Sequence, residues 1–271
     1  ARFGSDELRQ QFLAPAIALV PPLCAFAVVP FGPGDLVISN LDSGMLFVFA
    51  ILGFGIYGTT LGGWASANNF ARLGSLRGAA QMVSYEVSMG LNLVGIFLVF
   101  GTVSLTQIVA GQGELLFGWL PKWGIFVQPF GFVLFLAAAM AENKRAPFDL
   151  PEGESEIIGY FVEYSAMGFA TFMLSEFVEV IVIACIAATL FFGGWQIPWV
   201  DPAGTAGGWI TVAQVAFFAA KVLFLCWFQM LIRWTVPRFR YDQVMSLGWK
   251  VLLPLSLANI LATAVVLALI A

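Results

Sequence analysis

Histidine is absent from this sequence of 271 residues, and charged residues make up only 10% of it. The first absence removes the most common protein ligand of haem, zinc and copper, so we expect this chain to bind no metal. The second excludes an ordinary soluble domain, in which about 25% of the residues are charged. Cysteine is scarce as well. Cys24, Cys185 and Cys226 all lie in apolar runs, which argues against a disulfide framework.

Hydrophobic residues fill the chain instead. They make up 60% of it, and the mean hydropathy is +0.91. Stretches of about 20 apolar residues are long enough to cross a bilayer as helices. We therefore predict an all-α, polytopic transmembrane helical bundle that forms a single integral membrane domain over residues 1–271. The seven predicted spans cover residues 12–31, 45–66, 80–105, 124–142, 164–192, 210–232 and 250–271.

Basic residues are concentrated on one set of the connections between these spans. The positive-inside rule makes that side cytoplasmic. The opposite connections hold only Lys122, and Lys221 lies within the sixth span. The basic residues on the predicted cytoplasmic side are Arg2, Arg9, Arg72, Arg77, Lys144, Arg145, Arg233, Arg238, Arg240 and Lys250.

Five acids lie within the predicted spans or at their ends. A charged side chain at the centre of a membrane helix costs about 2.5–3.5 kcal/mol, so such acids usually face a bundle interior or a wet cavity. Glu86 lies in the third span, Glu142 ends the fourth, and Glu163 opens the fifth. Glu176 and Glu179 are deeper in the fifth span, and their spacing of three residues places them on one helix face.

Two interpretations of these acids remain open. They are either buried ion pairs and subunit contacts, or members of a proton relay. Lys221 is the only base within a predicted span, and its pairing with Glu179 or Glu176 would fit the first interpretation. Five acids against one base favour the second, because most of the acids would then lack a cation.

The connection between the fourth and fifth spans, residues 143–163, carries a run of acids. Pro147 and Pro151 forbid a continuous helix across it. The run does not end in water, because Glu142 and Glu163 continue it into the flanking spans. This pattern predicts a negatively charged entrance that leads into the bundle.

Three segments carry a specific resemblance. They read AENKRAPFDLPEGESE (141–156), AAQMVSYE (79–86) and RWTVPRFRYDQVMSLGWK (233–250). With them, nearly the whole chain resembles the quinone-proximal membrane subunit of respiratory complex I, the proton-pumping NADH:quinone oxidoreductase of mitochondria and bacteria. Members of that family usually have eight spans, and the first of these has no counterpart here. The quinone contacts supplied by that region therefore cannot be assigned.

The resemblance implies roles for three groups of residues. The proton relay toward the antiporter-like subunits would comprise Glu86, Glu142, Glu163, Glu176 and the neighbouring Tyr85. The acidic loop beside the quinone chamber would comprise Arg145, Asp149, Glu152, Glu154 and Glu156. The basic loop 233–249, with Arg233, Arg238, Arg240, Tyr241 and Asp242, would dock the hydrophilic arm. Glu179 departs from the family pattern, and for it we expect a buried pair with Lys221.

The resemblance also implies the partners and the setting. The chain would be a non-redox subunit of an enzyme that reduces quinone, with FMN and iron–sulfur clusters on partner subunits. Its partners would be the hydrophilic-arm subunits with the terminal cluster, small membrane subunits, antiporter-like subunits, quinone and lipid, but no nucleic acid. We expect it in an energy-transducing membrane, the bacterial inner membrane or else the mitochondrial inner membrane. The alternatives are a related docking subunit of a membrane-bound hydrogenase or other redox-driven pump, a proton-coupled transporter, and a purely structural anchor.

Overall fold

The computed structural model describes residues 5–34, 36–116, 118–151, 159–199 and 208–270, and in these ranges the chain is almost entirely helical. Its helices are α1 (Ser5–Ala25), α2 (Gly44–Gly53), α3 (Gly55–Ala65), α4 (Asn69–Phe100), α5 (Leu105–Gln112), α6 (Gly124–Val127), α7 (Pro129–Glu142), α8 (Ala166–Phe191), α9 (Gly208–Thr235), α10 (Tyr241–Ser246) and α11 (Leu253–Ile270). A 3₁₀ turn at Phe26–Val28 follows α1, and a π-helical turn at Leu247–Leu252 joins α10 to α11. The strands β1 (Leu115–Leu116) and β2 (Leu120–Pro121) form one short antiparallel pair.

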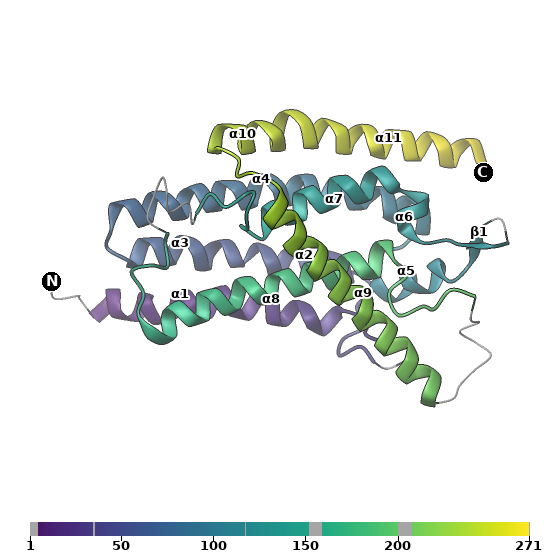
Figure 1. The fold of residues 1–271 in the computed structure, drawn as a ribbon, viewed down its shortest axis with the longest axis horizontal. Coiled ribbons are helices and arrows are strands. Elements are labelled where there is room, and N and C mark those ends of the chain that lie inside the picture. The colour runs from purple at the N-terminus through teal and green to yellow at the C-terminus, as the bar shows by residue number, and fades with distance from the viewer. Residues whose placement is uncertain (1–4, 35, 117, 152–158, 200–207, 271) are drawn as a thin grey trace.

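The predicted all-α membrane architecture is confirmed. Five helical stretches are long and apolar enough to cross a membrane, namely Gly44–Ala65, Asn69–Phe100, Ala166–Phe191, Gly208–Thr235 and Tyr241–Leu269. Two shorter apolar helices, Leu13–Val28 and Pro129–Glu142, correspond to the other two predicted spans. All of these helices run roughly along the long axis of the molecule except α9, which crosses the bundle obliquely (Figure 1).

Two layers of helices enclose the core. In one layer α1 packs against α3 and α8, and in the other α4 packs against α7 and α11, while contacts between α3 and α4 join the layers. Small residues allow the closest approaches, as is common between membrane helices. At Gly58 of α3, an added Cβ would lie 2.7 Å from the Cα of Ala18 in α1. Glycine therefore fixes the spacing between these two helices.

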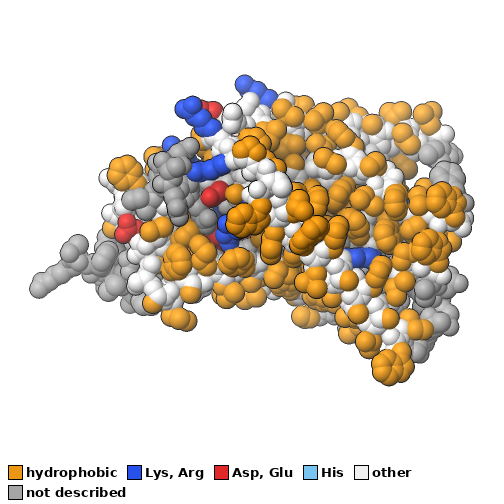
Figure 2. All heavy atoms as spheres, viewed as in Figure 1, with side chains coloured by type: hydrophobic (Ala, Val, Ile, Leu, Met, Phe, Trp, Pro, Cys, Tyr) orange, Lys and Arg blue, Asp and Glu red, His pale blue; other side chains and the backbone are white. Residues whose placement is uncertain are grey.

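The charged side chains visible in Figure 2 gather mainly around the start of α10, whereas hydrophobic side chains cover the surface over α9 and α11. Such a surface suits contact with lipid or with other membrane subunits. Near the charged end α7 terminates, and the chain enters the acidic connection that leads to α8 (Figure 1).

Candidate functional site

A short charged segment is buried where α7 ends. Glu142 is its last residue, and Asn143, Lys144 and Arg145 follow, all of them at most 9% exposed. Lys144 adopts a left-handed conformation with φ of 52°, which glycine usually supplies after a helix. That conformation costs a residue with a side chain about 1–3 kcal/mol. It reverses the chain at once, so the two basic side chains are held inside the protein.

Both bases meet the acids of α8. A nitrogen of the Arg145 guanidinium lies 3.0 Å from an oxygen of Glu176, and the Lys144 ammonium lies 3.8 Å from an oxygen of Glu179. The two acids are on one face of α8, as their spacing predicted. The Arg145–Glu176 contact is not aligned as a hydrogen bond, so both atoms keep the capacity to bind another partner.

These contacts correct the charge balance that we expected in the bundle. Lys221 is half-buried, whereas Lys144 and Arg145 fold inward from the connection and are buried. Glu176 and Glu179 therefore have cationic neighbours. The sequence placed the two bases in a cytoplasmic loop, and nothing local in the sequence showed that this loop turns back into the protein.

Glu142 and Glu86 extend the cluster toward α4. The Glu142 side chain is fully buried, repels the carboxylates of Glu179 and Glu86, and is attracted by Lys144. One of its oxygens has no hydrogen-bond partner among the described residues. Glu86 is half-buried and reaches the break between α2 and α3, where its carboxylate lies 3.0 Å from the position of a Cβ added at Gly53. The cluster therefore runs from α8 across the end of α7 to α4.

Two tyrosines lie near this cluster, and only one of them points into it. The hydroxyl of Tyr160 donates a hydrogen bond of 3.2 Å to Glu176. Tyr160 was not among the predicted site residues, because its spacing of 16 residues from Glu176 gives no local signal. Tyr85, which we expected beside the relay, is fully buried and donates its hydroxyl to the backbone carbonyl of Val244 in α10. Its hydroxyl thus serves the packing of α4 against α10.

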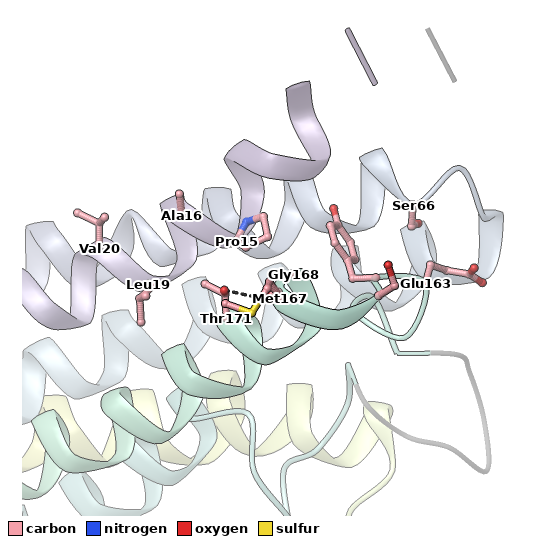
Figure 3. A pocket seen from close by; sticks show the side chains of 11 residues that line it. Pro15, Ala16, Leu19, Val20, Ser66, Glu163, Met167, Gly168 and Thr171 are labelled. Carbon is pink, nitrogen blue, oxygen red and sulfur yellow. Dashed lines mark hydrogen bonds between the residues drawn. The ribbon is translucent and has the colours of Figure 1, made fainter. Parts of the chain in front are cut away.

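Glu163 lies apart from the buried acids, at the surface. Its carboxylate accepts a hydrogen bond of 2.8 Å from the side-chain amide of Asn68. It also lines a cavity of about 420 Å³ between α1 and α8. Figure 3 shows Leu19 of α1 facing Thr171 of α8, with Glu163 at one end of the cavity. The cavity therefore has apolar walls and one charged end.

The acidic loop is described only in part. Glu152, Glu154 and Glu156 lie outside the described residues. The backbone carbonyl of Asp149 accepts a hydrogen bond of 2.8 Å from Arg238. The amide of Phe239 donates to the carbonyl of Pro147 at 3.0 Å. The basic loop 233–249 is thus attached to the beginning of the acidic loop.

The other residues of the basic loop lie at the surface. Arg240 and Asp242 are exposed and 3.6 Å apart. The ring of Tyr241 lies beneath the guanidinium of Arg77, 5.6 Å from its centroid. Arg233 is exposed in the last turn of α9. This loop therefore offers a mainly basic outer surface.

The predicted pair of Glu179 and Lys221 does not form. The Lys221 ammonium instead donates to the backbone carbonyls of Phe192, Gly194 and Gln196 at 2.7, 2.8 and 3.0 Å. These carbonyls follow the end of α8, where a cation is favoured by the helix dipole. Lys221 therefore caps α8 at the end opposite the acids, and Lys144 takes its expected place beside Glu179.

The cluster consists of carboxylates and bases, which are groups capable of exchanging protons. Within the described residues no group of three or more Cys, Asp or Glu side chains could hold a metal ion. Buried carboxylates with movable cations can instead take up and release protons when a nearby charge changes. The cluster offers three buried acids, Glu176, Glu179 and Glu142, and the half-buried Glu86.

Comparison with known proteins agrees with this picture. A family model described as NADH dehydrogenase matches residues 7–264. The chain is 44% identical over 261 residues to an H subunit of NADH-quinone oxidoreductase (the one numbered 1) from Geobacter metallireducens, and the match covers 93% of this chain and 74% of that relative. It is 43% identical over 263 residues to the H subunit numbered 2 from Rhizobium meliloti, with 94% and 75% covered. For the H subunit of Bordetella pertussis the identity is 42% over 253 residues, with 90% and 68% covered.

These matches extend over nearly the whole of this chain, and they confirm the resemblance carried by the three quoted segments. The chain therefore belongs to the NADH dehydrogenase family that includes the H subunits of NADH-quinone oxidoreductase.

Proposed function

We propose that this chain is the membrane subunit of a proton-translocating NADH:quinone oxidoreductase that helps to form the quinone-reduction chamber and passes charge changes into the membrane arm. One observation carries this proposal beyond family membership. The acids Glu176, Glu179, Glu142 and Glu86 form a line of interacting groups that begins beside the acidic loop and crosses the bundle.

The chain would act without a redox group of its own. Reduction of a quinone to a quinol takes two electrons and two protons. The electrons would come from an iron–sulfur cluster on a hydrophilic partner subunit. That cluster would in turn receive them from FMN on another partner. Negative charge that forms on the quinone would raise the proton affinity of nearby carboxylates, and strongly so in a poorly screened cavity. The loop acids, beginning with Asp149, would sense that charge.

The geometry suggests an order for the relay that differs from the order of the residues in the chain. Glu176 contacts Tyr160 and Arg145, which both belong to the connection between α7 and α8. Glu179 follows one turn later on α8, and Lys144 interacts with both Glu179 and Glu142. A proton that arrives at Glu176 would weaken the attraction between Glu176 and Arg145. This change in charge would pass to Glu142 through Lys144. Glu179, which we expected outside the relay, becomes one of its members.

The last member is Glu86, which Glu142 repels. Its carboxylate lies beside the break between α2 and α3, at the far end of the line. Protonation there would act on the neighbouring membrane subunits, either by carrying a proton or by acting as an electrostatic switch.

The cavity between α1 and α8 fits a path for the quinone. Its walls include Leu19, Val20 and Met167, which suit an isoprenoid tail, and Glu163 marks the end nearer the loop. Its volume of about 420 Å³ falls within the usual range of small-molecule sites. We place this opening toward the lipid of the bacterial inner membrane, with the basic loop 233–249 facing the hydrophilic arm.

The test replaces Glu142 or Glu86 by glutamine in the assembled complex. Glutamine keeps the shape of the side chain but cannot exchange a proton. We expect NADH-driven quinone reduction and proton pumping to fall together by at least about tenfold, the scale of a lost proton-transfer group. The matched control is Glu114→Gln, since Glu114 is an exposed acid in a surface pair with Lys122. Full activity and normal pumping in both relay variants would refute the relay.

A further inference from the structure

A second cavity lies where the ends of α7 and α9 meet the middle of α8. Its volume is about 260 Å³. It is separate from the cavity between α1 and α8, because the two share no lining residue. The residues that matter in it are Asn143, Arg145, Phe177, Gln229, Arg233 and Trp234.

One side of this cavity is apolar and open. Phe177 is 53% exposed, and Met230 and Trp234 are exposed as well. Trp234 lies in the last turn of α9, next to Arg233. Tryptophan is enriched at the level of lipid headgroups, because its ring is apolar and its N–H is polar. This side of the cavity therefore faces the boundary between hydrocarbon and water.

The other side is polar and buried. Asn143 is 1% exposed, its amide nitrogen donates to Gln229 at 3.1 Å, and its oxygen has no hydrogen-bond partner among the described residues. A buried polar atom without a partner is costly, so a ligand or water that supplies one is favoured. The inner wall of the cavity thus has unused capacity for hydrogen bonds.

The cations of the cavity differ in their partners. The Arg145 guanidinium is held by Glu176 and stacks over the ring of Phe177, 4.7 Å from its centroid. Arg233 is exposed and has no acidic partner within the described part of the chain. A guanidinium matches a phosphate group in shape and charge, and binds it through two parallel hydrogen bonds.

From these features we infer that the cavity is a binding site for one anionic phospholipid of the cytoplasmic leaflet. Arg233 binds the phosphate, Asn143 accepts a hydrogen bond from a headgroup hydroxyl, and the acyl chains lie along Phe177, Met230 and Trp234. Basic pockets between membrane helices on this side are suited to anionic headgroups. The inference goes beyond the proposed function, since it concerns neither quinone nor the relay.

The charge of Arg233 favours a bound phospholipid over a helix of a partner subunit as the occupant of the cavity. An apolar helix packed over the cavity would bury the Arg233 guanidinium without an anion, which is costly. A lipid supplies both the anion and the apolar chains that the two sides require. The bound lipid would also cover the Arg145–Glu176 pair from the membrane.

The test uses the assembled complex in nanodiscs of phosphatidylcholine that contain a small fraction of photoactivatable phosphatidylglycerol. After illumination, the label on the peptide that holds Met230 and Trp234 is measured by mass spectrometry. We expect Arg233→Ala to reduce this label by about tenfold, the scale set by a charged hydrogen bond, and Arg233→Lys to restore most of it. Lys250→Ala is the control, because Lys250 is an exposed cation at the same end but outside the cavity.

Equal labelling of the wild type and of Arg233→Ala would overturn the proposal. So would equal labelling by photoactivatable phosphatidylcholine, which carries no net charge, or cross-links from this peptide to a partner subunit in place of lipid. This experiment measures only the lipid bound at one peptide. The lipid proposal can therefore fail while the relay variants behave as proposed, and it can be supported while the relay variants do not.

Discussion

Glu176 has both a hydrogen-bond donor and a cation as neighbours, and it is 1% exposed. An acid so deeply buried is tolerated as an ion only if its partners stay in place. Arg145 supplies the charge, and Tyr160 orients the carboxylate. The position of the acid could be predicted from the sequence, but its partners could not, because the loop brings one of them back from 31 residues away.

Loss of the Arg145 cation alone should therefore lower the stability of the protein strongly. Replacement of Arg145 by alanine leaves a buried carboxylate without its partner, which typically costs about 3–5 kcal/mol. We expect a clearly lower midpoint of thermal inactivation for the complex in detergent. The double variant Arg145→Ala with Glu176→Gln should recover much of the loss, since it removes the orphaned charge. A single variant as stable as the wild type would show that the pair contributes nothing.

Gly53 provides a finer test of the position of Glu86. A methyl group added there lies 3.0 Å from the Glu86 carboxylate, so the flexible end of that side chain must shift by a few tenths of an ångström. We expect Gly53→Ala to lower quinone-coupled pumping less than Glu86→Gln does, without loss of assembly. Gly90→Ala in α4 is the matched control, because nothing lies within 4 Å of its added methyl group. Equal activity of both alanine variants would show that pumping does not depend on the position of the Glu86 carboxylate beside Gly53.

Among the helices, the spans were predictable but their interruptions were not. Apolar runs of bilayer length identify seven spans whatever their internal geometry. The span at residues 44–65 is nevertheless broken at Phe54, and the last span, Tyr241–Leu269, contains a π-helical turn at Leu247–Leu252. Hydropathy averages over a window and does not register a break of one or two residues. Gly53 and Gly55 were the only local sign of the break at Phe54 in the sequence.

The end of α8 depends on a lysine from another helix. Lys221 donates to three backbone carbonyls for which the described residues show no other donor. Lys221→Met keeps the length of the side chain but removes the donors, and we expect it to cost about 1–3 kcal/mol. The midpoint of thermal inactivation in detergent measures this loss of stability. Lys122→Ala, at the exposed pair with Glu114, should change stability by no more than about 1 kcal/mol. Similar midpoints for the two variants would contradict the capping role.

Across the whole molecule, the sequence predicted that several acids lie inside the helical bundle. Glu142, Glu176 and Glu179 are buried within the bundle, and Arg240 and Asp242 of the basic loop are exposed at its surface. What the sequence could not supply was the assignment of pairs. Lys144 and Lys221 are each compatible with Glu179 by type, and only the folded chain shows that Lys221 lies at the other end of α8. Pairing depends on where helices cross, and that is a property of packing rather than of spacing.

The orientation of the chain in the membrane follows from the same charge distribution and can be tested directly. Asn69 is exposed on the predicted cytoplasmic side, and Glu114 is exposed on the opposite side. In variants with Asn69→Cys or Glu114→Cys, a thiol reagent that cannot cross membranes should label the first only in inverted vesicles and the second only in right-side-out cells. The native Cys185 is buried, and Cys24 and Cys226 are half-buried within helices, so the unmodified chain measures the background. Labelling of both variants from one side would overturn the odd number of spans, and with it the placement of the basic loop toward the hydrophilic arm.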